Sequence, residues 1–318
     1  MHEPPRGERE VLAQEVLGRS GKCKYCRSNA VTKYGFKRGI QVLRCGECFH
    51  TFLDNGRLPK MRTPTHVIGA SLHLRFDGLS LTKTQGTLEN LLGVRRHISS
   101  IWRWAIKFCP LVSEYLSQFK ARLSDRWQAD ETVIFIRGKL AYFWEVLDSE
   151  TRYIPSVHLS TGGRTSQDAV TLFRKARNHS LQKPKLILTD RLQAYGVGVH
   201  KVFYSYREHW TNQWKHENRI HITDRDRNIN LIERFHNTLK ERYKTLRGFK
   251  SWAGAKAFLG GFVTHYNHLR IHSVLKSTPA EIAGVVLPER SWRALLKWAV
   301  AWSNVSQAPS HNVARGGV

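Results

Sequence analysis

Residues 186–190 read Leu-Ile-Leu-Thr-Asp, an apolar run that ends on a carboxylate. A run this short and this apolar predicts a buried strand rather than a helix. In open α/β sheets, ligands bind beyond the carboxyl ends of the strands. Asp190 is therefore the first candidate for a functional side chain.

Two other acids stand in comparable surroundings. Asp130 ends the run Trp-Gln-Ala-Asp at residues 127–130, and Glu233 lies in Asn-Leu-Ile-Glu-Arg-Phe-His at residues 230–236. Only a fold can bring acids this far apart in sequence together. If they converge, they form an oxygen-rich site for hard cations such as Mg²⁺ or Mn²⁺. Two such ions about 4 Å apart can clamp the attacking and leaving oxygens of a phosphodiester.

The surrounding pattern predicts an α/β core, a mixed sheet flanked by helices. Three extended apolar runs are followed by a helix, a short strand and a second helix, and turn residues at 137–139 and 148–150 separate the first three runs. The expected strands are 127–136, 140–147, 153–159 and 185–189, and the expected helices are 166–178 and 229–247.

Local geometry limits which acids can act together. Side chains alternate along a strand, so Asp130 and Glu131 should not both be ligands unless a bulge intervenes. On the second helix, Glu233 and Lys240 are seven residues apart and stack on one line. Two other acids fit a turn and a helix start, respectively Asp148 and Asp168. Two acids in a polar loop could replace Glu233 as the third metal ligand, namely Asp224 and Asp226.

Composition indicates a polyanionic partner. The chain has 318 residues with 51 Lys and Arg against 25 Asp and Glu, so 51 − 25 gives a net charge of +26. Such a surface attracts nucleic acid, and binding should weaken steeply with salt. The ten tryptophans indicate a large folded core rather than a disordered basic coat. No signal peptide or membrane-length apolar run is evident, so we expect a soluble, intracellular protein.

Four of the five cysteines form a pattern typical of a zinc ribbon. One Cys-x-x-Cys pair is followed by a second after eighteen residues, and Zn²⁺ accepts four thiolates in a tetrahedron. A hairpin turned at residues 37–39 should separate the pairs. A redox pair or a chance pattern is the alternative. Cys109 is expected to be a buried apolar residue. The expected ligands of one structural zinc are Cys23, Cys26, Cys45 and Cys48.

Residues 82–107 are typical of a helix-turn-helix. The run 82–85 has the form of a capping box and should start a helix that ends at Leu92, before a turn at 93–94. The next helix carries an apolar face and, opposite it, a basic face that suits a DNA major groove. An ordinary amphipathic helix is the alternative. The expected DNA-contacting residues are Arg95, Arg96, Ser99, Arg103 and Lys107.

The sequence therefore divides into six expected segments. They are a flexible N-terminus at 1–20, a zinc ribbon at 21–53, a helix-turn-helix domain at 60–108, a connecting helix at 109–124, a catalytic domain at 125–250 and a C-terminal helical region at 251–318.

The acids and several motifs resemble the DDE transposases of bacterial and archaeal insertion sequences. The IS-six type is the most similar, on Leu-Thr-Asp at 188–190, the run 230–236 and Leu-Arg-Gly-Phe-Lys at 246–250. Tyr266-Asn267, Arg270, His272 and Thr-Pro-Ala-Glu at 278–281 are similar to the tails of many transposases and retroviral-type integrases. The resemblance extends over about residues 65–285.

This resemblance implies a ribonuclease H-like core that nicks DNA at element ends and then joins the freed 3′-hydroxyl to target DNA. It implies two Mg²⁺ or Mn²⁺ ions on Asp130, Asp190 and Glu233, with Lys240 on a phosphate near the scissile bond. The implied partners are double-stranded DNA, as terminal inverted repeats and target, and a second copy of the chain in a homodimer or larger assembly. The implied location is the prokaryotic cytoplasm, at the nucleoid. A catalytically silent, DNA-binding regulator derived from a transposase is the alternative.

Overall fold

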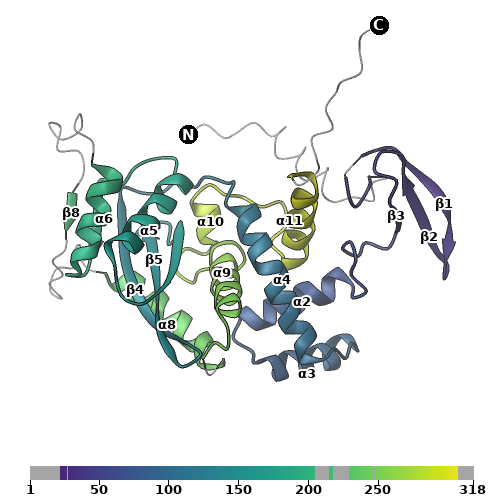
Figure 1. Ribbon diagram of the computed structural model, residues 1–318, viewed down its shortest axis with the longest axis horizontal. Coiled ribbons are helices and arrows are strands. Elements are labelled where there is room, and N and C mark those ends of the chain that lie inside the picture. The colour runs from purple at the N-terminus through teal and green to yellow at the C-terminus, as the bar shows by residue number, and fades with distance from the viewer. Residues whose placement is uncertain (1–21, 27, 205–214, 218–228, 247, 307–318) are drawn as a thin grey trace, which may run out of the picture. The chain divides into compact units, whose positions relative to one another are not determined.

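A computed structural model describes residues 22–26, 28–204, 215–217, 229–246 and 248–306 (Figure 1). The chain divides into two compact units, one made of residues 1–69 with 291–318 and the other of residues 70–290. The expected flexible segment at 1–20 lies outside the described residues. The larger unit contains both the predicted helix-turn-helix and the predicted sheet, so no boundary at 108 or 250 separates compact units.

The larger unit is built around a mixed five-stranded sheet. Its strands are β4 (Arg126–Ile136), β5 (Lys139–Asp148), β6 (Ser156–Thr161), β7 (Leu186–Thr189) and β8 (Lys215–Glu217), in the order β6-β5-β4-β7-β8. β4 pairs antiparallel with β5, and β5 pairs antiparallel with β6. β4 and β8 both pair parallel with β7. This order, with these directions, is the ribonuclease H-like arrangement, and the predicted α/β core is confirmed.

β6 begins three residues later than predicted, and the cause is local. Pro155 has no N–H to give to a sheet ladder, and Ile154 bonds elsewhere. The side-chain amide of Asn267 accepts from the Ile154 N–H at 3.0 Å and donates to the Ile154 carbonyl at 2.9 Å. An α9 side chain therefore holds the backbone of Ile154, while the Tyr153 carbonyl accepts from the Asp148 N–H at the end of β5 at 2.9 Å.

The two faces of the sheet are covered by different helices. On one face, α5 (Ser166–His179) and α6 (Gln193–Phe203) pack over β4 and β5, and this cluster includes the buried rings of Trp127 and Trp144 (Figure 1). On the other face lies α8 (Asn230–Lys244), where the carbonyl of the Gln128 side chain accepts from the Ile232 N–H at 3.2 Å. That bond fixes the first turn of α8 beside β4.

Sequence reasoning missed α6. Its residues include Gly196, Val197, Gly198 and Val199, which are poor helix formers. Tertiary packing overrides that preference, because a glycine lets α6 approach α5 closely. A Cβ at position 198 would lie 2.8 Å from the Cβ of Ala169.

The remaining helices of this unit are α2 (Thr65–Phe76), α3 (Leu81–Leu92), α4 (Ile98–Leu116), α9 (Trp252–His268) and α10 (Pro279–Ile282), with the first residues of α2 in the smaller unit. The two helices predicted on either side of residues 93–94 are confirmed, as is the turn, where Gly93 takes the left-handed conformation at φ 61°. The predicted cap is wrong. Ser80 caps α3 by accepting from the Lys83 N–H at 3.2 Å, and Thr82 lies inside the helix.

The predicted connecting helix at 109–124 is also wrong. α4 runs unbroken through Pro110 and ends at Leu116. An internal proline costs a helix about 3 kcal/mol. The apolar face that starts at Ile101 continues through Phe108, Cys109 and Val112, which are all fully buried, and this packing keeps the helix continuous.

In its described residues, the smaller unit contains a three-stranded antiparallel sheet, the first residues of α2 and a further helix. The strands are β1 (Val31–Lys37), β2 (Ile40–Cys45) and β3 (Thr51–Leu53), and the further helix is α11 (Trp292–Ser306). The predicted hairpin is confirmed, since Arg38 and Gly39 form its turn at positive φ. Within the described parts of both units, no helix has the length and apolar character needed to cross a membrane.

The close contact between α5 and α6 predicts a position-specific effect of alanine. Gly198→Ala should destabilise the fold by about 1–3 kcal/mol, because Ala169 is packed too rigidly to move. Gly86→Ala is the matched control, since nothing lies within 4 Å of its Cβ on α3. That change should stabilise the protein by about 0.5–1 kcal/mol. Thermal unfolding midpoints that move in the same direction would contradict the packing described.

Candidate functional site

Asp130 and Asp190 meet where β7 ends. The last parallel pair of β4 and β7 is Ala129 with Thr189, so each aspartate directly follows a paired residue. Carboxylate oxygens of Asp130, Glu131 and Asp190 all lie within 4.8 Å of one another. Three oxygen donors at this spacing suit a hard divalent cation. We call these three residues the acidic cluster.

Strand alternation predicted that Asp130 and Glu131 would not both be ligands without a bulge, yet the structure brings their carboxylate oxygens within 4.8 Å of each other. β4 keeps an unbroken register with β5 through both residues, so no bulge is present. The two side chains do leave on opposite faces. β7 stops at Thr189, however, and the edge of β4 beyond Ala129 is open on that side. The longer Glu131 side chain reaches around this open edge toward the two aspartates.

Two donors hold the Glu131 carboxylate. The Tyr195 hydroxyl on α6 donates to Oε2 at 2.6 Å, and Arg164 Nη1 donates to Oε1 at 2.8 Å. The Leu192 N–H donates to Asp190 Oδ1 at 2.9 Å and orients that carboxylate. The acidic cluster is therefore held in place by residues that precede and begin α5 and α6.

Burial and the closeness of like charges disfavour ionisation of the carboxyl groups in this cluster. Burial, with the nearby Glu131 and Glu145 carboxylates, raises the pKa of Asp130 to about 7. Like charges packed this closely resist joint ionisation. A bound divalent cation would remove that conflict, so the residues fit such an ion.

A histidine lies behind Asp130 on the α8 face. His236 Nε2 is 3.0 Å from Glu145 Oε2, and Nδ1 is 3.6 Å from Asp130 Oδ2. Burial raises the pKa of Glu145 well above its usual range, and burial lowers the pKa of His236. The neutral forms of both groups are thus favoured. His236 links a fully buried acid to the acidic cluster.

Glu233 and Lys240 lie on the same helix as His236. Glu233 is exposed in the first turn of α8 and stands outside the group of carboxylates within 4.8 Å. Lys240 is exposed one turn beyond His236. Its positive charge lowers the pKa of Glu145, against the larger upward effect of burial, so it lies within electrostatic reach of that acid.

The competing acids have structural partners or lie elsewhere. Asp168 caps α5 in a capping box with Thr165, as expected. Asp148, the last residue of β5 before the turn, accepts from the hydroxyls of Ser124 and Thr151. Asp224 and Asp226 lie outside the described residues.

Sequence reasoning missed Glu131, Glu145 and His236. The available signal for Glu145 was a lone acid inside the apolar run 140–147, which is costly unless the acid has a partner. For His236 the signal was its spacing. It follows Ile232 by four residues and so falls on the buried face of α8.

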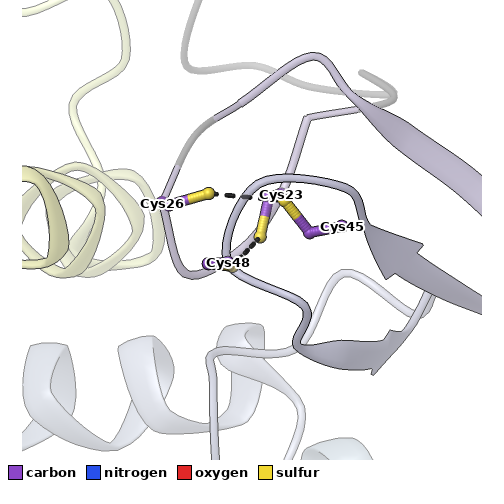
Figure 2. Close-up of side chains that lie close together, drawn as sticks. All are labelled: Cys23, Cys26, Cys45 and Cys48. Carbon is purple, nitrogen blue, oxygen red and sulfur yellow. Dashed lines mark hydrogen bonds between the residues drawn. The ribbon is translucent and has the colours of Figure 1, made fainter. Parts of the chain in front are cut away.

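The four paired cysteines converge in the smaller unit (Figure 2). Cys23 Sγ is 3.5 Å from Cys48 Sγ, and Cys26 Sγ is 3.4 Å from Cys45 Sγ. Burial raises the pKa of the Cys23 thiol to about 12, so a thiolate there needs a cation beside it. Four sulfurs at one point fit a tetrahedral Zn²⁺. Cys109 is fully buried in α4, as expected.

The predicted DNA-contacting residues flank the start of α4. Arg95, Arg103 and Lys107 are exposed, and Arg96 and Ser99 are half-buried. Four of these residues, namely Arg95, Arg96, Ser99 and Lys107, have local partners. Arg95 Nε is 3.8 Å from Glu89, and Ser99 Oγ is 2.8 Å from the His97 ring that caps the helix. The basic face predicted from sequence is therefore present, although part of it has local contacts.

The cysteine cluster predicts a specific loss of metal. The purified protein should contain one zinc per chain by elemental analysis, and Cys23→Ser should lower that content, because three thiolates hold Zn²⁺ less well than four. Cys109→Ala is the control and should retain the metal. Unchanged zinc in Cys23→Ser would contradict a four-thiolate site.

Comparisons with known proteins agree with the geometry of the acidic cluster. Residues 124–272 match a family model described as a DDE domain, DDE_Tnp_IS240. The transposase of the insertion sequence-like element IS431mec from Staphylococcus aureus is 25% identical over 150 residues, which is 47% of this chain and 62% of that protein. The transposase of insertion sequence element IS257 in transposon Tn4003, also from Staphylococcus aureus, matches equally well. The chain thus spans less than two thirds of these relatives.

Solved structures with some likeness include the magnesium-bound catalytic core domain of HTLV-2 integrase, at 19% identity and a TM-score of 0.37. That likeness covers 52% of this chain and 97% of the integrase domain. The Mos1 transposase catalytic domain is similar at 15% identity and a TM-score of 0.27, over 64% of this chain and 91% of that domain. The fold assignment rests on strand order and direction instead.

The matched segment is narrower than the expected resemblance over 65–285, but it contains Asp130, Asp190, Glu233 and Lys240. The DDE transposase resemblance is confirmed over that segment. Over residues 124–272, this chain is similar to the DDE domain family.

Proposed function

We propose that this chain is a DNA transposase that cleaves phosphodiester bonds at the ends of its element and joins the freed 3′-hydroxyl to target DNA. One observation carries the proposal. Two aspartates from separate segments of a DDE domain meet with a third carboxylate at the end of β7, within 4.8 Å. The net charge of +26 supplies the affinity for DNA that such chemistry needs.

In this proposal Asp130 and Asp190 hold Mg²⁺ or Mn²⁺, and Glu233 completes the acid set for a second ion. Such ions, when bound, activate the attacking oxygen and stabilise the leaving oxygen of the phosphodiester. Glu233 is supported by its place in the first turn of α8, which the Gln128 side chain anchors to the same face of β4 as Asp130. Glu131 supports the site through Tyr195 and Arg164 and adds an oxygen beside both aspartates.

Two other residues would act on position and charge. Lys240, two turns after Glu233, would bind a phosphate near the scissile bond. His236 would position the Asp130 carboxylate, because its ring stands between that carboxylate and buried Glu145. Neither residue needs to form a covalent bond to DNA. The reaction requires no nucleophilic serine or tyrosine, since water and a 3′-hydroxyl attack in turn.

The remaining modules would recognise DNA. The basic face at the start of α4, with Arg96, Arg103 and Lys107, suits a major groove at the terminal inverted repeats. The zinc ribbon would add a second contact. Two element ends must be joined in one event, so the active form would be a homodimer or a larger assembly, working at the prokaryotic nucleoid.

The experiment incubates the protein with duplex DNA from the region that flanks its gene, in Mg²⁺ or Mn²⁺, and resolves cut and joined strands on a denaturing gel. The wild-type protein should cut and join. Asp190→Asn and Glu233→Gln should each lower the cutting rate at least ~100-fold, the loss expected when transition-state charge is left unbalanced. Asp125→Asn is the matched control, an exposed acid paired with Lys185, and should cut normally.

Each other outcome has a clear meaning. Binding without cutting, unchanged in Asp190→Asn, would favour the silent regulator. Cutting without joining would favour a plain nuclease. Normal cutting by Glu233→Gln together with loss in Glu131→Gln would make Glu131 the third ligand and would overturn the assignment of Glu233.

A further inference from the structure

A strongly basic pocket lies beside α8, away from the acidic cluster. Its volume is about 70 Å³, the space of roughly two water molecules. It is formed by α8, by the end of α9 with the segment that follows, and by the turn between β5 and β6. Its polar lining consists of Arg152, Arg234, Thr238, Tyr266, Arg270 and His272, and the rest is apolar.

The charges in this pocket are unbalanced. No carboxylate lines the part of the pocket that the structure describes. Within the described residues, Arg152, Arg234 and Arg270 form no ion pair, whereas Arg164 and Arg290 each pair with a glutamate. Three guanidinium groups around one small space repel one another unless an anion lies between them.

The residues influence one another directly. Burial lowers the pKa of Arg152, and so does the Arg234 cation, against the opposite effects of Tyr266 and of the Asp148 carboxylate. Burial also lowers the pKa of His272, as do the cations of Arg152 and Arg270. The Arg270 guanidinium lies 5.9 Å from the centre of the Tyr266 ring, whose π face helps to hold it in place. The pocket is thus a cluster of donors in which Arg152, Arg270 and His272 are partly buried and Arg234 is exposed.

The position of the pocket on α8 separates it from the acidic cluster. At 100° per residue, Glu233 and Lys240 lie on one flank of the helix, and Arg234 and Thr238 lie on the opposite flank. A helix with its side chains is about 10–12 Å across. An anion in the pocket is therefore a different group from the phosphate that reacts, on the far side of the same helix.

We propose that this pocket binds a non-reacting phosphodiester of the DNA backbone. The proposal rests on the proposed transposase function. The size suits one phosphate group, the fork geometry of guanidinium groups matches phosphate oxygens, and Thr238 and Tyr266 add hydroxyl donors. DNA strands carry a phosphate every ~3.4 Å along the axis, so a backbone that crosses α8 presents one at this distance from the scissile bond. The contact would fix how DNA lies across α8.

The test measures binding to duplex DNA from the flanks of the gene by fluorescence anisotropy in EDTA, at several salt concentrations. Arg270→Gln should weaken binding about tenfold, the loss expected for one charged hydrogen-bonding group. The slope of log affinity against log salt should fall by about 1. Arg270→Lys should restore the slope, because the charge returns. Arg174→Gln, which removes the same charge from exposed α5, is the control and should keep the wild-type slope.

Failure of this proposal is distinct from failure of the transposase proposal, because binding in EDTA needs no catalysis. Equal slopes for Arg270→Gln, Arg174→Gln and wild type would overturn the pocket assignment even if the wild type cuts DNA. A lowered slope only in Arg270→Gln would support it even if no cutting occurred.

Calorimetric titration with inorganic phosphate separates the DNA backbone from a free ligand of the same chemistry. We expect no saturable binding at sub-millimolar phosphate, since the duplex supplies the positioning that a lone anion lacks. Saturable binding that Arg270→Gln removes, with duplex affinity unchanged, would assign the pocket to free phosphate and overturn the proposal.

Discussion

The parallel pairing of β4 with β7 is the constraint on which the candidate site depends. Four residue pairs, from Arg126 with Leu186 to Ala129 with Thr189, bring Asp130 and Asp190 to the same level at the end of β7. Carboxylates repel one another, and nothing in the local chain would keep them together. Burial of Trp127 and Ile187 in the sheet supplies the opposing free energy, roughly 1.5–3 kcal/mol for each large apolar side chain. The core therefore holds the acids where their charges alone would not.

Polar residues around the acidic cluster offset the repulsion between its carboxylates. Arg164 and Tyr195 satisfy Glu131 from the α5–α6 side of the sheet, and His236 stands between Asp130 and Glu145 on the α8 side. The site is thus supported from both faces, so substitutions in α6 or α8 can disturb it without touching a carboxylate of the cluster. Glu145 Oε1 is buried without a hydrogen-bond partner among the described residues. Burying that oxygen therefore lowers the stability of the fold.

Much of this architecture could be predicted from the sequence, because its signals are local. The apolar runs that became β4, β5 and β7 and the hairpin between the cysteine pairs follow from strand periodicity, turn residues and motif spacing, whereas the convergence of Asp130 with Asp190 was implied by the resemblance to DDE transposases. The errors have a common physical cause, namely tertiary contact. α6 forms from glycine and valine because it packs on Ala169, and α4 passes through Pro110 because its buried face continues. Glu131 joins the aspartates because β7 is short, and strand alternation alone cannot show where a neighbouring strand stops. The basic pocket joins Arg152 to Arg270, which only the folded chain brings together.

The most direct measurement of the central claim is a crystal structure of the wild-type protein soaked in Mn²⁺, with the ion located by anomalous scattering. The account predicts a manganese peak between the carboxylates of Asp130 and Asp190 at about 2.0–2.2 Å from oxygen, the distance typical of small divalent ions, and no peak there in Asp190→Asn. A wild-type crystal with manganese bound elsewhere and none at the end of β7 would contradict the account.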